Sequence, residues 1–403
     1  MVKRKFLIII IFVISILTRL ILFYLVYDPD WCGGLVREYR VIAENVLDGH
    51  GFSMEIEDKY VPKIVHPPGY SLFLATIFAL FGRSDFPVRA IQILIDSLSV
   101  ILIFLIVERI FGGFTALIAA LIACLYPFSV IMSFMLLPAT VALFISILAA
   151  YFYTKNELKL SDYIISSILF GLAALFRSQL IVVPFFISLG FILGKGIKRG
   201  IKPLMYILIP AFLVISPWTI RNWRHFHKFV PLSIGLGWSM WVGIGEDFPT
   251  SGAPRNDGEL AESEHYDSCT YPFPIERDRA RVKKSLNFIK TQPFQYVQVM
   301  IKRLFRLLMG FNVPVKPIFR FFIRFIKFFL IFLGTLGMIF SLKRRELLPL
   351  IILPWGLALC LIPMHVEGRY FLPSIFPFFI FAAETVKIGL NRFMKLQVEK
   401  GEK

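Results

Sequence analysis

Residues Phe6–Tyr27 read FLIIIIFVISILTRLILFYLVY, an apolar run preceded by the basic segment Met1–Lys5. A helix needs about 20 mostly apolar residues to cross a bilayer, and this run meets that length. A cleaved signal peptide is the alternative, but its apolar region is shorter and ends at a small-residue cleavage site. No such site follows Tyr27, so we interpret residues 1–27 as an uncleaved first transmembrane helix.

Nine further apolar runs follow along the chain, at 90–107, 113–131, 134–153, 162–178, 180–194, 203–217, 322–342, 347–363 and 370–388. The sequence is 57% hydrophobic and 18% charged, whereas soluble domains are about 45–50% apolar and about 25% charged. This composition excludes a soluble enzyme, a disordered chain and a secreted disulfide scaffold. It predicts an all-α integral membrane protein, a polytopic bundle of about ten transmembrane helices.

The orientation follows from the basic residues that flank the runs. With ten helices, five clusters fall on one side of the membrane: Lys3, Arg4 and Lys5; Lys155 and Lys159; Lys195, Lys198, Arg199 and Lys202; Lys343, Arg344 and Arg345; and Lys387, Arg392 and Lys395. Positive charges favour the cytoplasmic side. We therefore expect a multi-pass protein of the cell (inner) membrane with both termini cytoplasmic. The net charge of +17 fits anionic membrane lipids, and no nucleic-acid partner is expected because no binding motif is present.

This topology divides the chain into six parts: the first helix 1–27, a first outer loop 28–88 with amphipathic surface helices, transmembrane helices two to seven 89–217, a second outer loop or small helical lid 218–320, helices eight to ten 321–390, and a cytoplasmic basic tail 391–403. Within the lid, Gly243–Asp267 is rich in Gly, Pro, Ser and acids, which predicts a flexible stretch. The segment Ile275–Ile289 is charged and helix-like.

Two cysteines, Cys32 and Cys269, lie in the outer loops, where a disulfide is permitted. Whether they pair is left open. No Cys or His spacing is typical of a metal site, so no metal ligand is predicted. No cofactor is implied, and participation of a divalent cation stays open.

The first outer loop carries a helical pattern at Leu35–Leu47, with apolar residues on one face and charges on the other. Gly49-His50-Gly51 then ends this amphipathic helix. The segment His66-Pro67-Pro68-Gly69-Tyr70 predicts a rigid turn before a second apolar helix at 71–82.

Several motifs occur in a fixed order: YRVIAENVLDGHGF at 39–52, HPPGY at 66–70, FG at 81–82, GLAALFR at 171–177, PWTIRN at 217–222 and HVEGRYFLP at 365–373. Together they resemble glycosyltransferase family 39, the polyprenyl-phosphate-sugar transferases related to protein O-mannosyltransferases and the lipid A aminoarabinose transferase. The resemblance implies a C-type glycosyltransferase fold. It further implies transfer of a hexosyl or pentosyl group from a polyprenyl-phosphate donor, with inversion, to an extracytoplasmic acceptor such as a protein, a lipid or a cell-wall glycan.

The acceptor proton needs a base, and a carboxylate can serve. The family places an acid four positions before the residue matching Tyr39, but here that position is Leu35. Glu38 lies one helical turn beyond Leu35 and projects near the same edge of the helix. Asp28 and Asp30, just after the first helix, are the other candidates for the catalytic residue. A base elsewhere, or no catalysis, stays open.

The donor phosphate needs cations, and the guanidinium fork of arginine matches phosphate oxygens. The candidates for binding the donor phosphate, at outer membrane ends, are Arg177, Arg369, Arg221 and His66. The simpler interpretations are snorkelling for Arg177, interfacial anchoring for Arg369 and Arg221, and a structural role for His66. Substrate-binding residues implied by the motifs are Tyr39, Tyr70, His365 and Glu367. Arg320, Arg324 and Lys327 follow helical spacing and are open to holding the phosphate or resting on anionic lipid. Asp96, inside a span, is expected to hydrogen-bond Gln92 or Ser97.

The main hypothesis is thus a membrane glycosyltransferase. One alternative is a catalytically impaired protein that binds polyprenyl-phosphate sugars on the same scaffold, since the acid is lost at Leu35. Another is a transporter, which predicts inverted repeats; the sequence shows no such internal symmetry.

Overall fold

The computed structural model describes residues 2–27, 34–248, 251, 253, 259, 274–310 and 316–401. The helices in the first half are α1 (Val2–Val26), α2 (Gly34–Leu47), α3 (Gly69–Phe81), α4 (Asp85–Phe111), α5 (Gly113–Leu125), α6 (Pro127–Phe134), α7 (Ala139–Tyr153), α8 (Leu160–Phe176) and α9 (Val183–Lys195). The second half has α10 (Ile197–Phe226), α11 (Leu236–Asp247), α13 (Pro274–Thr291), α14 (Pro293–Met309), α15 (Pro317–Phe340), α16 (Leu348–Leu361), α17 (Gly368–Phe371) and α18 (Phe376–Gly401).

Three short 3-10 helices and one hairpin complete the described structure. The 3-10 helices are η2 (Ser178–Val182), η4 (Arg345–Leu347) and η5 (Leu372–Ser374). The strands β1 (Ser53–Ile56) and β2 (Lys59–Pro62) pair antiparallel, with Ser53 opposite Pro62 and Ile56 opposite Lys59. Glu57 and Asp58 connect them with positive φ, as a tight two-residue hairpin turn requires.

Among the described residues, five helical segments are long and apolar enough to cross a bilayer: Arg4–Val26, Asp85–Phe111, Ser178–Lys195, Pro203–Phe226 and Pro317–Phe340. Two bent pairs, α5 with α6 and α17–η5 with α18, raise the number to seven, with bends of 53° and 68°. Shorter apolar helices, including α7 and α8, pack among them. The predicted all-α, multi-pass membrane fold is confirmed, and the number of ten spans stays a prediction.

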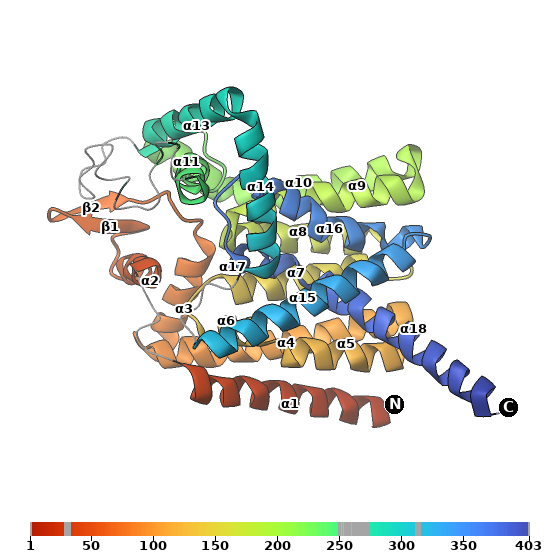
Figure 1. Cartoon of the computed structure of the whole chain (residues 1–403). Helices are drawn as coiled ribbons and strands as arrows, with labels where there is room; N and C mark the ends of the chain where they lie inside the picture. The colour runs from red at the N-terminus through yellow and green to blue at the C-terminus, as the bar shows by residue number, and fades with distance from the viewer. Residues whose placement is uncertain are drawn as a thin grey trace.

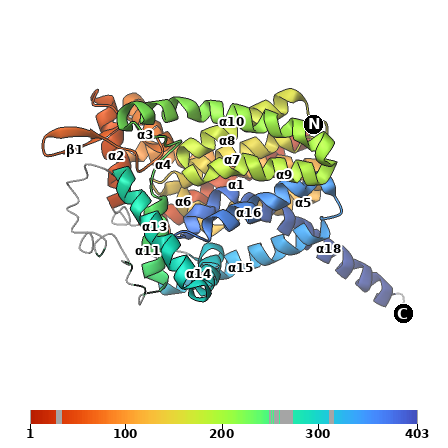
Figure 2. The ribbon, with the colours of Figure 1, turned by 90° about the horizontal axis from the view of Figure 1, so that it is seen from above.

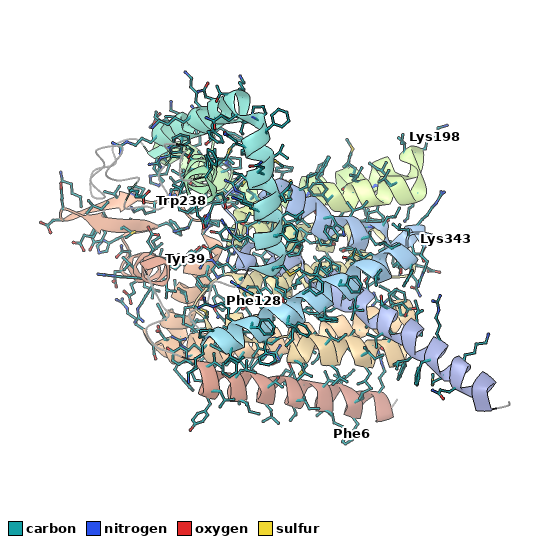
Figure 3. The ribbon with its side chains drawn as sticks, viewed as in Figure 1. Phe6, Tyr39, Phe128, Lys198, Trp238 and Lys343 are labelled. Atoms are coloured by element: carbon teal, nitrogen blue, oxygen red, sulfur yellow. The ribbon has the colours of Figure 1, made fainter. Side chains whose placement is uncertain are left out.

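The long helices lie alongside one another in a bundle whose two ends differ (Figure 1). Both views place α2, the hairpin, α11 and α13 at one end of the bundle, and the start of α1 and the end of α18 at the other (Figure 2). The side chains of Tyr39 and Trp238 mark the first end, and Lys198 and Lys343 mark the second (Figure 3). The two ends of the described chain therefore share one side of the bundle, opposite the elements of the two large loops.

Helix α10 continues beyond the expected span end at 217 to Phe226. It contains Pro203, Pro210 and Pro217, each of which removes a backbone donor. Their seven-residue spacing corresponds to nearly two turns, so the three rings fall near one face of the helix. The chain passes through PWTIRN without leaving the helix, and this carries Arg221 one turn beyond Pro217.

A buried ion pair attaches α1 to the rest of the bundle. Arg19 and Asp96 are each about 1% exposed, with Nη2 of Arg19 2.7 Å from Oδ2 of Asp96. The same guanidinium donates from Nη1 to Ser15 Oγ at 2.7 Å, and Ser129 Oγ donates to Asp96 Oδ1 at 3.0 Å. The prediction that Asp96 hydrogen-bonds Gln92 or Ser97 is wrong. The counter-charge for Asp96 comes instead from Arg19 on α1, which is distant in sequence. Every charged group of the pair is therefore hydrogen-bonded, as burial requires.

Removing one partner of this pair should destabilise the fold. Arg19→Leu leaves Asp96 as a buried unpaired charge, which costs about 3–5 kcal/mol. Asp96→Leu should cost a similar amount, and the double variant should recover most of the loss. The measurement is the free energy of unfolding in detergent, followed by circular dichroism across a denaturant series. Additive losses in the double variant would contradict the pairing.

Candidate functional site

Five of the predicted site residues come from four segments of the chain. Glu38 and Tyr39 lie on α2, His66 lies in the turn before α3, Arg177 is the C-cap of α8, and Arg369 lies on α17. The helix predicted at Leu35–Leu47 is α2, and the helix predicted at 71–82 is α3.

Close backbone contact brings the first loop onto the end of α8. A Cβ added at Gly69, the first residue of α3, would lie 2.6 Å from the carbonyl oxygen of Leu175. Only glycine fits such an approach without displacing the α8 backbone. The HPPGY turn therefore starts α3 directly beside the C-terminus of α8, and this places His66 and Tyr70 close to Arg177.

Two arginines flank one tyrosine ring at this point. The guanidinium carbon of Arg177 lies 5.3 Å from the centroid of Tyr370, and that of Arg369 lies 5.7 Å from it. Both distances are typical of cation–π contacts. Arg177 is 9% exposed, and its buried Nε has no hydrogen-bond partner. No carboxylate among the described residues lies within ion-pair distance of Arg177, so its charge is left for an anion.

Arg369, in contrast, has a counter-ion. Its Nη2 donates to Glu367 Oε1 at 2.9 Å, and its Nε lies 2.7 Å from Glu367 Oε2. Glu367 Oε1 also lies 3.5 Å from Nε2 of His365. The cluster of Arg177, Arg369, Glu367 and His365 thus holds more cationic than anionic groups.

Glu38 forms a dyad with His66. Nε2 of His66 lies 2.7 Å from Oε2 of Glu38, and both side chains are partly exposed. Burial of Glu38 would raise its pKa, but the hydrogen bond and the charge of His66 outweigh burial and hold the pKa of Glu38 below its ordinary value of 4.5. The carboxylate is therefore ionised at neutral pH and can accept a proton.

Tyr39 connects this dyad to the arginines. Its ring lies 4.8 Å from the His66 ring and 5.2 Å, edge to face, from the Tyr70 ring. Burial raises the pKa of Tyr39 to about 12 despite the charges of Arg177 and Arg369, so it stays a neutral phenol. Tyr70 is fully buried and donates its hydroxyl to Gln92 Oε1 at 2.7 Å, which gives it a supporting position behind Tyr39.

Arg221 makes a different set of contacts. It donates to the carbonyl oxygens of Lys63 at 2.8 Å and Phe52 at 3.0 Å, and its guanidinium lies 4.6 Å from the Trp218 ring. These carbonyls border the β1–β2 hairpin, so Arg221 ties the hairpin to α10. None of its described contacts is with the arginine cluster, and a phosphate-binding role for Arg221 stays a prediction.

Several predicted residues lie outside the described part of the chain: Asp28, Asp30, Cys32 and Cys269.

Of the three basic residues on α15, Lys327 is buried and donates to the carbonyl oxygens of Leu307 at 3.2 Å and Gly310 at 3.1 Å. It satisfies carbonyls at the C-terminal end of α14, a favourable place for a cation.

Sequence reasoning missed a network in the second large loop. Arg303 and Asp247 are fully buried, with Nε 2.7 Å from Oδ2, and Arg306 Nη1 lies 3.1 Å from Glu246 Oε1. The expectation of a flexible stretch from Gly243 is wrong for residues 243–247, which end α11. Arg303 and Arg306 are three residues apart on the strongly amphipathic α14, a spacing that places both on one face of the helix. This spacing is the sequence pattern from which the network could have been predicted.

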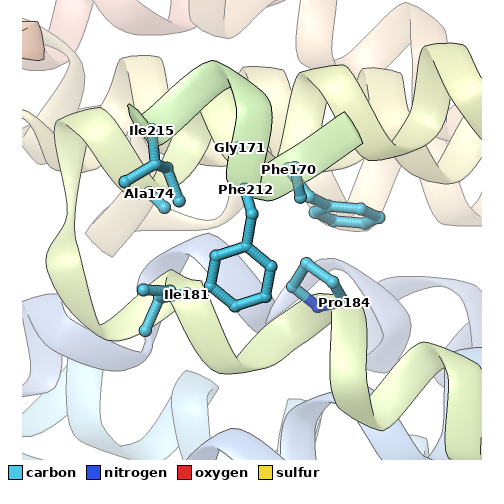
Figure 4. Close-up of a pocket in the computed structure, with 8 residues that line it drawn as sticks. Phe170, Gly171, Ala174, Ile181, Pro184, Phe212 and Ile215 are labelled. Carbon is cyan, nitrogen blue, oxygen red and sulfur yellow. The ribbon is translucent and has the colours of Figure 1, made fainter. Parts of the chain in front are cut away.

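The described residues contain no group of three or more His, Cys, Asp or Glu side chains that could hold a metal ion. An apolar pocket, in contrast, opens between α8, α9 and α10 (Figure 4). Its lining consists of Phe170, Gly171, Ala174, Ile181, Pro184, Ala211, Phe212 and Ile215. Ala174 and Ile181 of this lining flank Arg177 in sequence.

The chain was compared with known proteins. A family model described as dolichyl-phosphate-mannose-protein mannosyltransferase matches residues 65–223. This range includes His66, Arg177 and Arg221 but ends before the 365–373 motif. No curated protein matches the sequence.

Solved structures show the fold. The oligosaccharyltransferase of Archaeoglobus fulgidus in the apo form aligns with a TM-score of 0.56 at 14% identity, over 98% of this chain and 52% of that one. The same archaeal enzyme in complex with an inhibitory peptide and a dolichol-phosphate aligns with a TM-score of 0.56 at 15% identity, over 99% of this chain and 52% of that one. ArnT of Cupriavidus metallidurans bound to undecaprenyl phosphate gives a TM-score of 0.43 at 14% identity, over 92% and 77% of the two chains.

This chain thus spans about half the length of the oligosaccharyltransferase. The alignment with that enzyme confirms the predicted C-type glycosyltransferase fold, and the family match confirms, over residues 65–223, the resemblance drawn from the motifs.

The stability of the protein should depend on pH through His365. Burial lowers the pKa of His365, but hydrogen bonds and charges from Glu246 and Glu367 outweigh it and raise the pKa from 6.5 to about 9. The raised pKa means that the imidazolium stabilises the fold fully below pH 6.5 and that this contribution is lost as the pH rises through about 9. The midpoint of thermal unfolding in detergent should therefore fall over this window.

The matched comparison is His365→Gln beside His225→Gln, which changes an exposed histidine. The first variant should flatten the pH dependence between 6.5 and 9, and the second should leave it unchanged. An equal slope in His365→Gln and the wild type would show that another group causes the dependence.

Proposed function

We propose that this chain is a membrane glycosyltransferase that moves a sugar from a polyprenyl-phosphate donor to a hydroxyl or amine acceptor, with inversion. The observation that carries the proposal is the buried guanidinium of Arg177, which no carboxylate of the described residues pairs with; it lies at the Tyr370 ring together with Arg369 and near Tyr39, which contacts the Glu38–His66 dyad. Such a site joins anion binding to proton removal at one end of a membrane bundle.

The arginines suit the phosphate of the donor. A buried guanidinium without a partner is unfavourable, and phosphate oxygens would supply charge-assisted hydrogen bonds to it. As the bond from the anomeric carbon to the phosphate oxygen breaks, the polyprenyl phosphate leaves with the electron pair. Arg177 and Arg369 would stabilise the negative charge that develops there.

Glu38 is the proposed base. The acceptor oxygen or nitrogen forms a bond to the anomeric carbon, and its proton passes to the Glu38 carboxylate. The hydrogen bond from His66 holds that carboxylate in one orientation. Asp28 and Asp30 remain the other candidates for this role, and Tyr39, Tyr70, His365 and Glu367 remain proposed substrate-binding residues.

The apolar surface where α8, α9 and α10 meet suits contact with the hydrocarbon part of the donor. The described residues that line the shallow pocket there are apolar side chains and glycine. A polyprenyl chain that lies along this surface would keep its apolar part in the membrane while its phosphate reaches the arginine cluster. Membrane lipids would surround the remaining apolar surface of the bundle.

The orientation is part of the proposal. The ends of the described chain share one side of the bundle, and the basic clusters marked by Lys198 and Lys343 lie there. We assign this side to the cytoplasm and the site to the outer face of the cell (inner) membrane. Segments 28–88 and 218–320 would then be the outer loops, with α11, α13 and α14 as the lid.

A second candidate is a binding protein without transfer activity. It is favoured by Leu35, which replaces the expected acid, and by the ion pair that engages Glu38. This protein would bind polyprenyl phosphate through the same arginines but would release no product.

The test is turnover in lipid nanodiscs supplied with polyprenyl-phosphate hexoses or pentoses and extracts that contain acceptors. Glu38→Gln should lower release of free polyprenyl phosphate about 10²–10⁴-fold, the range for loss of a general base, while binding of polyprenyl phosphate persists. Arg177→Gln should weaken that binding itself. Glu44→Gln is the matched control, because the Glu44 carboxylate lies on the same helix but pairs with Arg40.

Full turnover by Glu38→Gln would move the base elsewhere, with Asp28 and Asp30 as the next variants. Binding without turnover in the wild type, for every donor and acceptor fraction, would favour the binding protein. Absence of any binding would contradict both.

A further inference from the structure

Side chains of alternating charge form a continuous row of contacts around the segment between α16 and α17. Nδ1 of His365 lies 2.7 Å from Oε2 of Glu246 on α11, and Nε2 lies 3.5 Å from Oε1 of Glu367. Both carboxylate oxygens of Glu367 contact the guanidinium of Arg369. Oε1 of Glu246 lies 3.1 Å from Nη1 of Arg306 on α14. The row therefore runs from the second large loop to the arginine cluster.

Both ring nitrogens of His365 face carboxylate oxygens. A neutral imidazole carries one N–H and one lone pair, so it would turn the lone pair toward one of the two carboxylates. The imidazolium donates from both nitrogens and fits this surrounding. Trp238 at 5.4 Å and Tyr370 at 6.3 Å, both edge-on, complete the surroundings of the ring.

The main chain of this segment is fixed by the same loop elements. His365 N donates to the carbonyl oxygen of Ser239 at 2.6 Å, and a Cβ added at Gly243 would lie 2.9 Å from that nitrogen. From α14, Tyr296 Oη and Arg303 Nη1 both donate to the carbonyl oxygen of Pro363, at 3.0 and 2.7 Å. Helices α11 and α14 thus hold the chain that leads into α17.

We propose that His365 is a positioning residue, which as an imidazolium between Glu246 and Glu367 orients Glu367 and through it the Arg369 guanidinium for a lipid phosphate. The inference rests on the proposed function, because it concerns the phosphate site proposed there. It says that the second large loop, through His365, fixes the position of Arg369 in that site. His365 itself binds no phosphate. It transmits the position of α11 to Arg369.

The experiment measures binding of undecaprenyl phosphate to the full chain in nanodiscs, for His365→Gln, Arg369→Gln and the double variant. His365→Gln should weaken binding about tenfold, a coupling usual for residues within one ion-pair network. In the Arg369→Gln background the same change should have no further effect. His365→Lys, which keeps a cation between the two carboxylates, should recover part of the affinity, and His225→Gln should bind as the wild type.

A purely structural role for His365 predicts a different pattern. The losses of His365→Gln and Arg369→Gln would then multiply in the double variant, and this result would overturn the positioning role. Unchanged binding in His365→Gln would overturn it too, while leaving the proposed function intact. A wild type that fails to bind the lipid would remove the proposed function and this inference together.

The wild type alone supplies a second measurement if the variants fold poorly. Burial lowers the pKa of His365, yet its two carboxylate partners raise it to about 9. The charged and titratable groups facing His365 from the packed elements are Glu246, Arg303 and Arg306 and, on its own segment, Glu367, Arg369 and Tyr370. Affinity for undecaprenyl phosphate should therefore fall as the pH rises through about 9, and a flat profile from pH 7 to 10 would contradict the role of the imidazolium.

Discussion

The contact of Arg177 and Arg369 with one tyrosine ring, that of Tyr370, is the constraint around which this end of the molecule is built. Two like charges at the edge of a membrane bundle are unfavourable unless their surroundings compensate them. The ring of Tyr370 and the single carboxylate of Glu367 compensate part of the charge. The remaining positive charge is the basis of the proposal that the cluster binds an anion. The contacts of α3 with α8, and of α14 with Pro363, hold its two halves in register.

Sequence alone predicted the helices well because apolar runs and helical periodicity are local properties. The run at 90–107 lies within α4, and the amphipathic pattern at Leu35–Leu47 became α2. The β1–β2 hairpin escaped prediction because its strands are four residues each and too short for a clear alternation. The apolar run at 203–217 predicted a span that ends at Pro217, whereas α10 extends to Phe226. In the structure three prolines share one face, and the helix continues.

The candidate site was likewise predictable only in part, because some of its contacts depend on the tertiary structure. The motifs indicated His66, Arg177 and Arg369, helical spacing from Leu35 indicated Glu38, and the fold brings these side chains around Tyr39 and Tyr370. Arg221 was grouped with them from its motif, yet its donors reach the carbonyls of the hairpin, which no periodicity could reveal. The pairing of Arg19 with Asp96, 77 positions away, and that of His365 with Glu246 required the tertiary arrangement.

The position at which the family resemblance predicts an acid is Leu35, and the first carboxylate that follows it on α2 is that of Glu38. Residues three apart on a helix are neighbours on its surface, so Glu38 offers a carboxylate from nearly the same edge of α2. A carboxylate moved by one turn needs a new partner to hold it. His66 supplies that partner at 2.7 Å. The dyad of Glu38 and His66 is thus the part of the proposed transferase site that would remove the acceptor proton.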